Sequence, residues 1–246
     1  MSKAHVLWLL IMFDCNAIAQ TAIITIKTRS EIIIAADSKA LKNNNPDSAI
    51  SVCKIRPIFN FFYGASGIIS DPITRFDFNS IVDTTFSTKR TLLDNIGKVA
   101  KSVKNVLPKT LASIEQRDRI AFKKEFEKGD MVALQVFFAG IENDSLKIYK
   151  SDFQFSPREN FRVTSVDKSC IAHCEKIYFF GHDSAMLAYD DRYGKSPIET
   201  WDSYAIRLIE IAKIHHKENV GGDVDALKIP IIGSPTWIRK KFKCQY

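Results

Sequence analysis

Residues 32–36 read Ile-Ile-Ile-Ala-Ala, so a strand at this place would carry apolar side chains on both of its faces. Such a strand is typical of a sheet that other layers of the protein cover on both sides. The preceding segment Ala22–Lys27, AIITIK, also favours a strand, and the short polar turn TRSE separates the two. We therefore expect the chain to open with a buried hairpin.

Groups of predicted strands alternate with groups of predicted helices along the rest of the chain. After a polar loop at Leu41–Ser48, the segments KIRPIF and FFYGASG favour two more strands. Apolar spacing then predicts helix within residues 72–128, strands up to Gly181, helices at SAMLAYDD and about 197–217, and a last strand at Val224–Ile229. This order indicates an α+β fold, with antiparallel sheets packed together and helices outside.

Size and composition fit one globular domain. The chain has 246 residues, of which 46% are apolar and 26% are charged. No repeat and no low-complexity linker divides the sequence. We therefore expect a single domain over residues 21–246.

The first twenty residues have a composition of their own. A basic start precedes the apolar run Val6–Phe13 and the small-residue motif at 17–19, Ala-Ile-Ala. This is the layout of a secretory signal peptide over residues 1–20, and no later segment approaches the roughly 20 apolar residues that span a bilayer. We expect export to the periplasm or the extracellular space, without stable membrane insertion after signal removal. A buried N-terminal strand is the alternative.

The formal net charge of +7 raises the question of an anionic partner. A basic exported protein could bind anionic polymers, and marked salt dependence would be the signature of such binding. The charges are spread along the chain, however, and the one dense cluster, Arg239–Lys243, is typical of a solvated tail. We do not expect a nucleic-acid partner.

The cysteines after residue 20 are Cys53, Cys170, Cys174 and Cys244. An even number permits disulfides in an exported protein, with three connectivities that the sequence does not distinguish. His173 between Cys170 and Cys174 would alternatively make half a metal site, but no second ligand pair is evident. A disulfide or free thiols are favoured, and we expect neither a metal nor a cofactor.

Four short motifs follow one another along the chain. They are Thr21–Ala40 with its Ala-Ala-Asp-Ser stretch, the pair Lys54-Ile55, Gly64–Asp71 (GASGIISD) and Phe179–Asp191 (FFGHDSAMLAYDD). In order and spacing they resemble the proteasome β-subunits and their bacterial relatives among the N-terminal-nucleophile hydrolases. The resemblance runs through most of residues 21–246, apart from an apparent insertion near 107–130. It implies a four-layer αββα sandwich of two antiparallel sheets flanked by helices.

The resemblance also implies a threonine-type amidohydrolase or peptidase that acts on a peptide or amide substrate and forms homo-oligomers. Thr21 would be the nucleophile, and its own α-amine, whose unperturbed pKa is about 7.7 to 8.0, would be the base. By the same resemblance Asp37 and Lys54 would tune that amine, and the Gly67 N–H would stabilise the oxyanion. Ser184 matches one of the family's serine positions.

Departures from the family pattern support a second hypothesis. Lys54 stands one position later than the family spacing, and Lys217 and Val220 occupy places where family members carry an aspartate and a serine. The small-residue motif at 17–19 directs cleavage after Ala19, which leaves Gln20 in front of Thr21 and its amine blocked. The alternative is therefore a catalytically silent domain of the same fold, acting as a binding or assembly component.

The histidines also admit two interpretations each. His182 stands at an expected serine position and is either a replacement proton carrier or a helix-start residue, with Ser184 as the N-cap. His215 and His216 fit a cation pair at a helix end better than a metal site.

Overall fold

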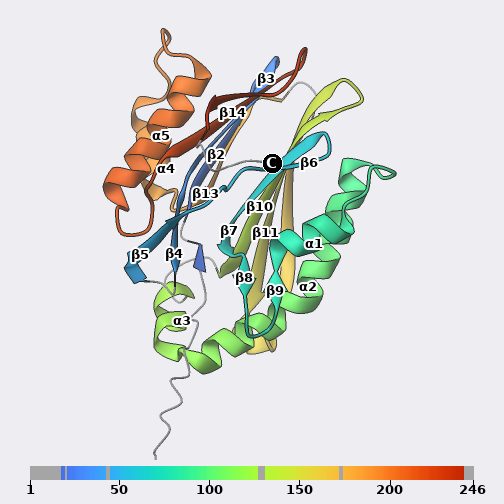
Figure 1. The fold of residues 1–246 in the computed structure, drawn as a ribbon, viewed down its shortest axis with the longest axis vertical. Coiled ribbons are helices and arrows are strands. Elements are labelled where there is room, and N and C mark those ends of the chain that lie inside the picture. The colour runs from blue at the N-terminus through green and yellow to red at the C-terminus, as the bar shows by residue number, and fades with distance from the viewer. Residues whose placement is uncertain (1–17, 20, 43–44, 127–130, 172–173, 241–246) are drawn as a thin grey trace, which may run out of the picture.

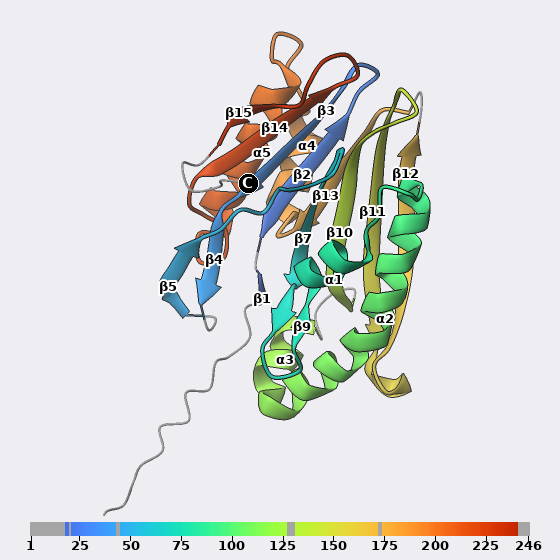
Figure 2. The ribbon, with the colours of Figure 1, turned by 45° about the vertical axis from the view of Figure 1, so that its right-hand side comes forward.

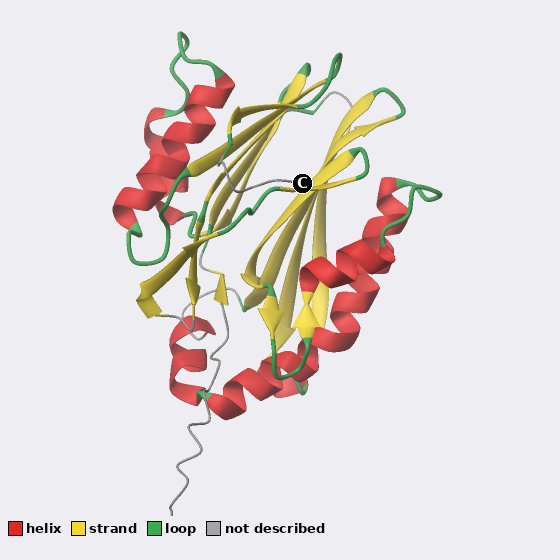
Figure 3. Cartoon of the chain, in the orientation of Figure 1, coloured by secondary structure: helices red, strands yellow, loops and turns green. Residues whose placement is uncertain are grey.

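The computed structural model describes residues 18–19, 21–42, 45–126, 131–171 and 174–240. Two main antiparallel sheets and five α-helices form this part of the chain (Figures 1 and 3). The predicted α+β class is confirmed, and the arrangement is compatible with a sandwich. Most of the predicted signal peptide lies outside the described residues.

The first sheet has the strand order β1-β7-β10-β11-β12, with β6 also paired to β7. The strands are β1 (Ile18–Ala19), β6 (Arg56–Ile58), β7 (Phe61–Ile68), β10 (Val132–Glu142), β11 (Ser145–Ser156) and β12 (Arg162–Ile171). Asn143 and Asp144 join β10 to β11 with φ of 52° and 55°. Two consecutive left-handed residues make a hairpin turn that matches the twist of the strands, and Asn and Asp tolerate this conformation well.

The second sheet has the order β13-β2-β3-β14-β15. Its strands are β13 (Lys176–Gly181), β2 (Ala22–Lys27), β3 (Glu31–Asp37), β14 (Val224–Pro230) and β15 (Thr236–Arg239). Residues Ile32 to Ala36 are all fully buried, so the prediction of a strand covered on both faces is confirmed. The prediction that Val224–Ile229 ends the series of strands is wrong, because β15 pairs with β14 at the sheet edge.

The polar loop predicted at Leu41–Ser48 is largely a hairpin. Strand β4 (Lys39–Lys42) pairs with β5 (Asn45–Ser51) in an antiparallel ladder. The asparagine and proline content of this stretch indicated a turn, but it did not show that the flanking residues pair with each other. Two further short strands, β8 (Ser70–Asp71) and β9 (Phe76–Asp77), lead into the helical region.

The helical region predicted within 72–128 is three helices, α1 (Phe78–Thr85), α2 (Leu92–Arg117) and α3 (Arg119–Phe126). The side chain of Asp77 accepts the N–H groups at the start of α1, and Thr91 caps α2 in the same way. The remaining helices are α4 (Ser184–Tyr193) and α5 (Trp201–His215), with a 3-10 turn at Pro157–Glu159. The apparent insertion at 107–130 is the second half of α2 together with α3, and 127–130 lie outside the described residues.

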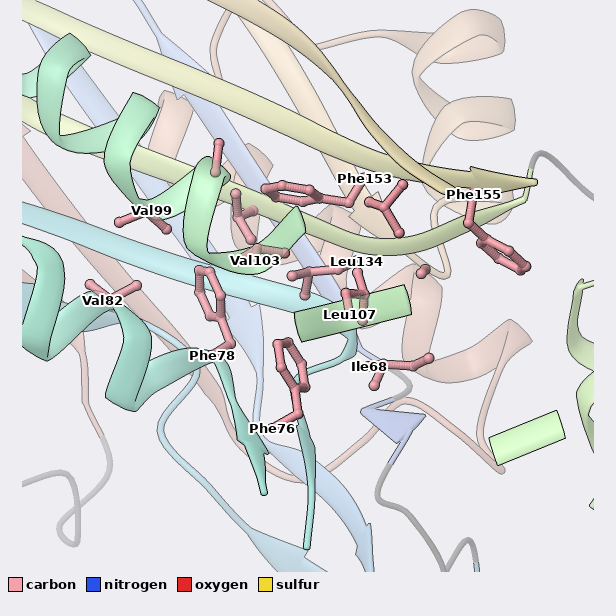
Figure 4. Close-up of a cluster of buried hydrophobic side chains, with 14 of the residues drawn as sticks. Ile68, Phe76, Phe78, Val82, Val99, Val103, Leu107, Leu134, Phe153 and Phe155 are labelled. Carbon is pink, nitrogen blue, oxygen red and sulfur yellow. The ribbon is translucent and has the colours of Figure 1, made fainter. Parts of the chain in front are cut away.

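Three clusters of buried apolar side chains hold the described elements together. One cluster joins the first sheet to α1, α2 and α3, and Figure 4 shows how Phe78 and Val103 of the helices meet Leu134 and Phe153 of the strands. Another joins the second sheet to α4 and α5, which lie against it in Figure 2. The third contains residues of both sheets, including Phe137 and Phe180, whose ring centroids are 5.4 Å apart. The sheets therefore pack directly on each other.

Candidate active site

Thr21 lies directly before β2, beside the end of β13. Its side chain is fully buried, and its hydroxyl has no hydrogen-bond partner within the described part of the chain. Its carbonyl accepts the backbone N–H of His182 at 2.8 Å. Gly181 has φ of +76°, and a Cβ there would stand 1.8 Å from the Thr21 carbonyl oxygen, so only glycine allows this approach. The turn at Gly181 and His182 thus fixes the Thr21 backbone without engaging its hydroxyl.

Asp37 ends β3 and is the centre of the site. Its Oδ1 accepts the Ala22 N–H at 2.9 Å and the Lys54 ammonium at 2.6 Å. Its Oδ2 accepts the N–H groups of Lys39 at 3.2 Å and Gly221 at 3.1 Å. The carboxylate is fully buried, and these donors compensate for the water that it has lost. Asp37 therefore joins the residue after Thr21 to Lys54.

Lys54 lies between β5 and β6, with only 4% of its side chain exposed. A buried ammonium needs a compensating charge, and the Asp37 carboxylate supplies it. Lys54 is thus a buried member of an ion pair and not a solvated surface lysine. Its displacement by one residue from the family spacing does not prevent its contact with Asp37. The neighbouring residue, Cys53, is disulfide-bonded.

Gly67 lies near the end of β7, at the edge that β1 covers. It has φ of +94°, and a Cβ there would stand 2.4 Å from the carbonyl oxygen of Ala133. On the other side of β7, Ala19 pairs with Gly67 and Ile18 with Ile68. The residues just before Thr21 therefore occupy the strand edge that carries the predicted oxyanion donor.

Ser184 is the first residue of α4 and contacts a histidine. The N-cap is Asp183, whose side chain makes no capping hydrogen bond, so the proposed N-cap role of Ser184 is wrong. The Ser184 hydroxyl lies 3.2 Å from Nε2 of His216. The His216 ring lies 5.1 Å from the His182 ring, centroid to centroid. Ser184 thus contacts one member of the pair His182 and His216. His182 is itself part of the turn that holds Thr21.

The pKa of His182 lies below its ordinary value of 6.5, chiefly because burial disfavours the imidazolium. Next in importance, His216 also lowers this pKa, whereas Asp37 raises it and Lys54 lowers it. The unfolded chain binds a proton on this imidazole more tightly than the folded chain does, so protonation of His182 favours unfolding. Neutral His182 therefore contributes its full stability above pH 6.5. This contribution is lost as the pH falls from there through the lowered folded pKa.

The variant His182→Gln is therefore expected to lose less stability than the parent protein between pH 7 and about pH 5. Urea unfolding of both proteins at the two pH values measures the difference. The variant His215→Gln, at an exposed position, is the matched control. An equal loss of stability in His182→Gln and the parent would contradict the assignment.

The stretch before Gly221 contributes backbone groups to the site rather than the expected polar side chains. The carbonyls of Lys217 and Glu218 accept the Lys39 ammonium at 2.9 and 2.8 Å. Val220 is buried, and its N–H donates to the His216 carbonyl. In the structure Lys217 and Val220 thus contribute backbone groups to this stretch.

The remaining sequence candidates do not form a metal centre in the described residues. Cys170 and Cys174 form a disulfide, so these thiols are not metal ligands, and His173 and Cys244 lie outside the described residues. No group of three or more His, Cys, Asp or Glu side chains in the described ranges could hold a metal ion. No helix of the described chain is both long and apolar enough to cross a bilayer.

Sequence reasoning missed three polar residues of the first sheet that reach this site. Gln135 on β10 contacts Gly181. On β11, Asp152 contacts Gln135, and Lys150 contacts Phe179. For Gln135 the available signal was its position, because it interrupts an otherwise apolar strand. Lys150 and Asp152 lie on a strand with many other polar residues, and their burial could not be read from the sequence.

No family model and no curated protein matches the sequence. Among solved structures, the chain is similar to Thiobacillus denitrificans BPH in complex with Epoxomicin, with 15% identity and a TM-score of 0.44. That match covers 87% of this chain and 100% of the other chain.

Proposed function

We propose that this protein is an exported threonine-type N-terminal-nucleophile hydrolase, which cleaves a peptide or amide bond after the residues before Thr21 have been removed. The proposal includes the four-layer αββα sandwich of that fold, and an oligomer of identical chains. The observation that carries it is the contact set of Asp37, which binds Lys54 and the Ala22 N–H beside the Thr21 hydroxyl, a group without a hydrogen-bond partner among the described residues.

These contacts suit an N-terminal threonine nucleophile. A threonine hydroxyl is a weak nucleophile until a base takes its proton, and a free Thr21 α-amine would be such a base. The Lys54 ammonium would favour the neutral form of that amine, and Asp37 holds the ammonium in place. The burial of the pair strengthens its electrostatic effect, because little water screens it.

The reaction then runs in two steps. The Thr21 Oγ attacks the substrate carbonyl while its proton passes to the amine, and the amine gives a proton to the leaving group. The N–H of Gly67 would stabilise the negative oxygen of the tetrahedral intermediate. Water then attacks the acyl ester, and the products are the acid and the regenerated threonine.

The strand β1 gives the proposed cleavage a second consequence. Because Ile18 and Ala19 pair with β7 at Ile68 and Gly67, the uncleaved chain covers this edge. Removal of residues 1–20 would create the α-amine and would also uncover Gly67. One processing event would thus supply the base and open the oxyanion site.

A catalytically silent domain is the second candidate. It is favoured by Lys217 and Val220, which bring no carboxylate or hydroxyl to the position beside Gly221, and by Gln20 in front of Thr21. In that case the same fold would act as a binding or assembly component with Thr21 internal to the chain.

The two candidates are separated by comparing two forms of the protein that differ by one residue. One form begins at Thr21 and the other at Gln20, and both are tested on a library of fluorogenic peptide amides. The hydrolase proposal predicts turnover only by the form that begins at Thr21. Absence of turnover in both forms would favour the silent domain. Mass in solution tests the oligomer, and a strict monomer would contradict that part.

A further inference from the structure

A row of polar side chains crosses three neighbouring strands of the first sheet. Gln135 on β10 pairs in register with Ser66 on β7 and with Asp152 on β11. Residues directly opposite each other on paired strands present their side chains on the same face. That face is the one that packs on the second sheet, because Phe137, two residues after Gln135, belongs to the cluster between the sheets.

The partners of Gln135 determine the orientation of its amide. Its Oε1 accepts the Gly181 N–H at 2.8 Å and lies 3.4 Å from the Ser66 hydroxyl, which donates. Its Nε2 donates to Oδ1 of Asp152 at 3.0 Å. An amide supplies an acceptor on one side and a donor on the other, and both are needed here.

A second contact ties the same row to β13. Lys150, two residues before Asp152 on β11, donates to the Phe179 carbonyl at 3.0 Å. Its ammonium lies 3.4 Å from Asp152 Oδ1. The backbone of β13 is thus held to the first sheet at Phe179 and at Gly181, immediately before His182 donates to the Thr21 carbonyl.

We propose that Gln135 is a positioning residue that fixes Thr21 relative to Gly67. Through Gly181 it holds the turn that binds the Thr21 backbone, and through Ser66 it contacts the residue next to Gly67. The inference rests on the proposed hydrolase function for its catalytic consequence, although the contacts themselves are testable without it. Acyl transfer needs the nucleophile and the oxyanion donor about 3 Å from the same carbonyl group, and a 1 Å misplacement can cost about 10²-fold in rate.

The first test measures backbone protection in the full chain. The variant Gln135→Leu removes the three hydrogen bonds of the side-chain amide, so hydrogen exchange of the Gly181 amide is expected to become about tenfold faster. The matched control is Gln154→Leu on β11, a half-buried glutamine outside the row, which leaves this exchange unchanged. Unchanged exchange in Gln135→Leu would overturn the inference.

A double variant tests whether the side chains at positions 135 and 152 must match as hydrogen-bond donor and acceptor for Gly181 to be protected. In Gln135→Glu the new carboxylate faces Asp152, and the repulsion is relieved as the pH is lowered and one carboxyl takes a proton. Adding Asp152→Asn reverses the contact, because the side-chain amide at position 152 then donates to the carboxylate at position 135. The double variant Gln135→Glu with Asp152→Asn is therefore expected to restore the protection of the Gly181 N–H from hydrogen exchange at neutral pH. Failure of the double variant to improve on Gln135→Glu would count against the proposed contact.

The second test measures catalysis in the form that begins at Thr21. With a fluorogenic peptide amide, Gln135→Leu is expected to lower kcat about 10²-fold and to change KM by less than about threefold. If the parent form does not hydrolyse any substrate, the proposed function fails, and the exchange test still decides the positioning role. If the parent is active and Gln135→Leu matches Gln154→Leu in kcat, the positioning role is overturned.

Discussion

Replacing Thr21 with valine is expected to abolish hydrolysis and at the same time to raise the free energy of unfolding by about 1 kcal/mol. Valine has nearly the shape of threonine, so it fills the same space in a site that is fully buried. The lost hydroxyl has no hydrogen-bond partner within the described residues, so its removal breaks no bond and relieves a desolvation cost. Urea unfolding of the full chain measures the stability, and hydrolysis by the form that begins at residue 21 measures the activity.

Thr25 on β2 supplies a matched control for this prediction. Its hydroxyl is also buried and without a partner in the described structure, but it lies away from the Asp37 contacts. Thr25→Val is therefore expected to gain a similar stability and to keep its activity. Thr21→Ser keeps a hydroxyl and should retain measurable turnover. Activity in Thr21→Val equal to that of the parent would contradict the mechanism.

Replacing Asp37 with alanine is expected to destabilise the full chain by about 3–5 kcal/mol, the largest loss predicted for a single site. The change removes the acceptor of four donors and leaves the buried Lys54 ammonium without this carboxylate. A carboxylate in an exposed pair, such as Glu159 with Arg162, serves as the control, because such pairs add little to stability. Urea unfolding measures both changes.

A second variant separates the structural role of this pair from its catalytic role. In the double variant Asp37→Asn with Lys54→Met, no charge is left buried alone, so part of the lost stability should return. Hydrolysis should stay absent, since the cation that we propose to tune the Thr21 amine is gone. Full activity of a folded Lys54→Met variant would show that a different group performs this function.

Local patterns in the sequence predicted much of the fold. Strands β2 and β3 are rich in isoleucine, whose branched side chains favour strands, and their pairing follows from a short turn. The hairpin of β4 and β5 was interpreted as a loop, because its polar residues carry no apolar alternation to reveal the pairing. Strand β15 was missed for a similar reason, since its exposed edge position leaves little apolar pattern.

The residues of the candidate site that belong to short sequence motifs were predictable. The residues that reach the site only because the two sheets pack on each other were not. The Asp37 and Lys54 assignments came from motifs in the family's order, with Lys54 one position later than the family spacing, and the structure joins the two residues. The contact of Gln135 with Gly181 depends on how two sheets pack face to face, which periodicity does not specify. The contact of Ser184 with His216 likewise joins α4 to the residue after α5.

The most direct test of the central claim is covalent labelling of the form that begins at Thr21 by a peptide epoxyketone, located by mass spectrometry. This probe forms its ring-closed adduct only with a hydroxyl and a free α-amine on the same residue. We predict one adduct per chain on Thr21, and none in Thr21→Val or in the form that begins at Gln20. An unlabelled Thr21 in the folded protein, or equal labelling of the form that begins at Gln20, would contradict an N-terminal threonine nucleophile.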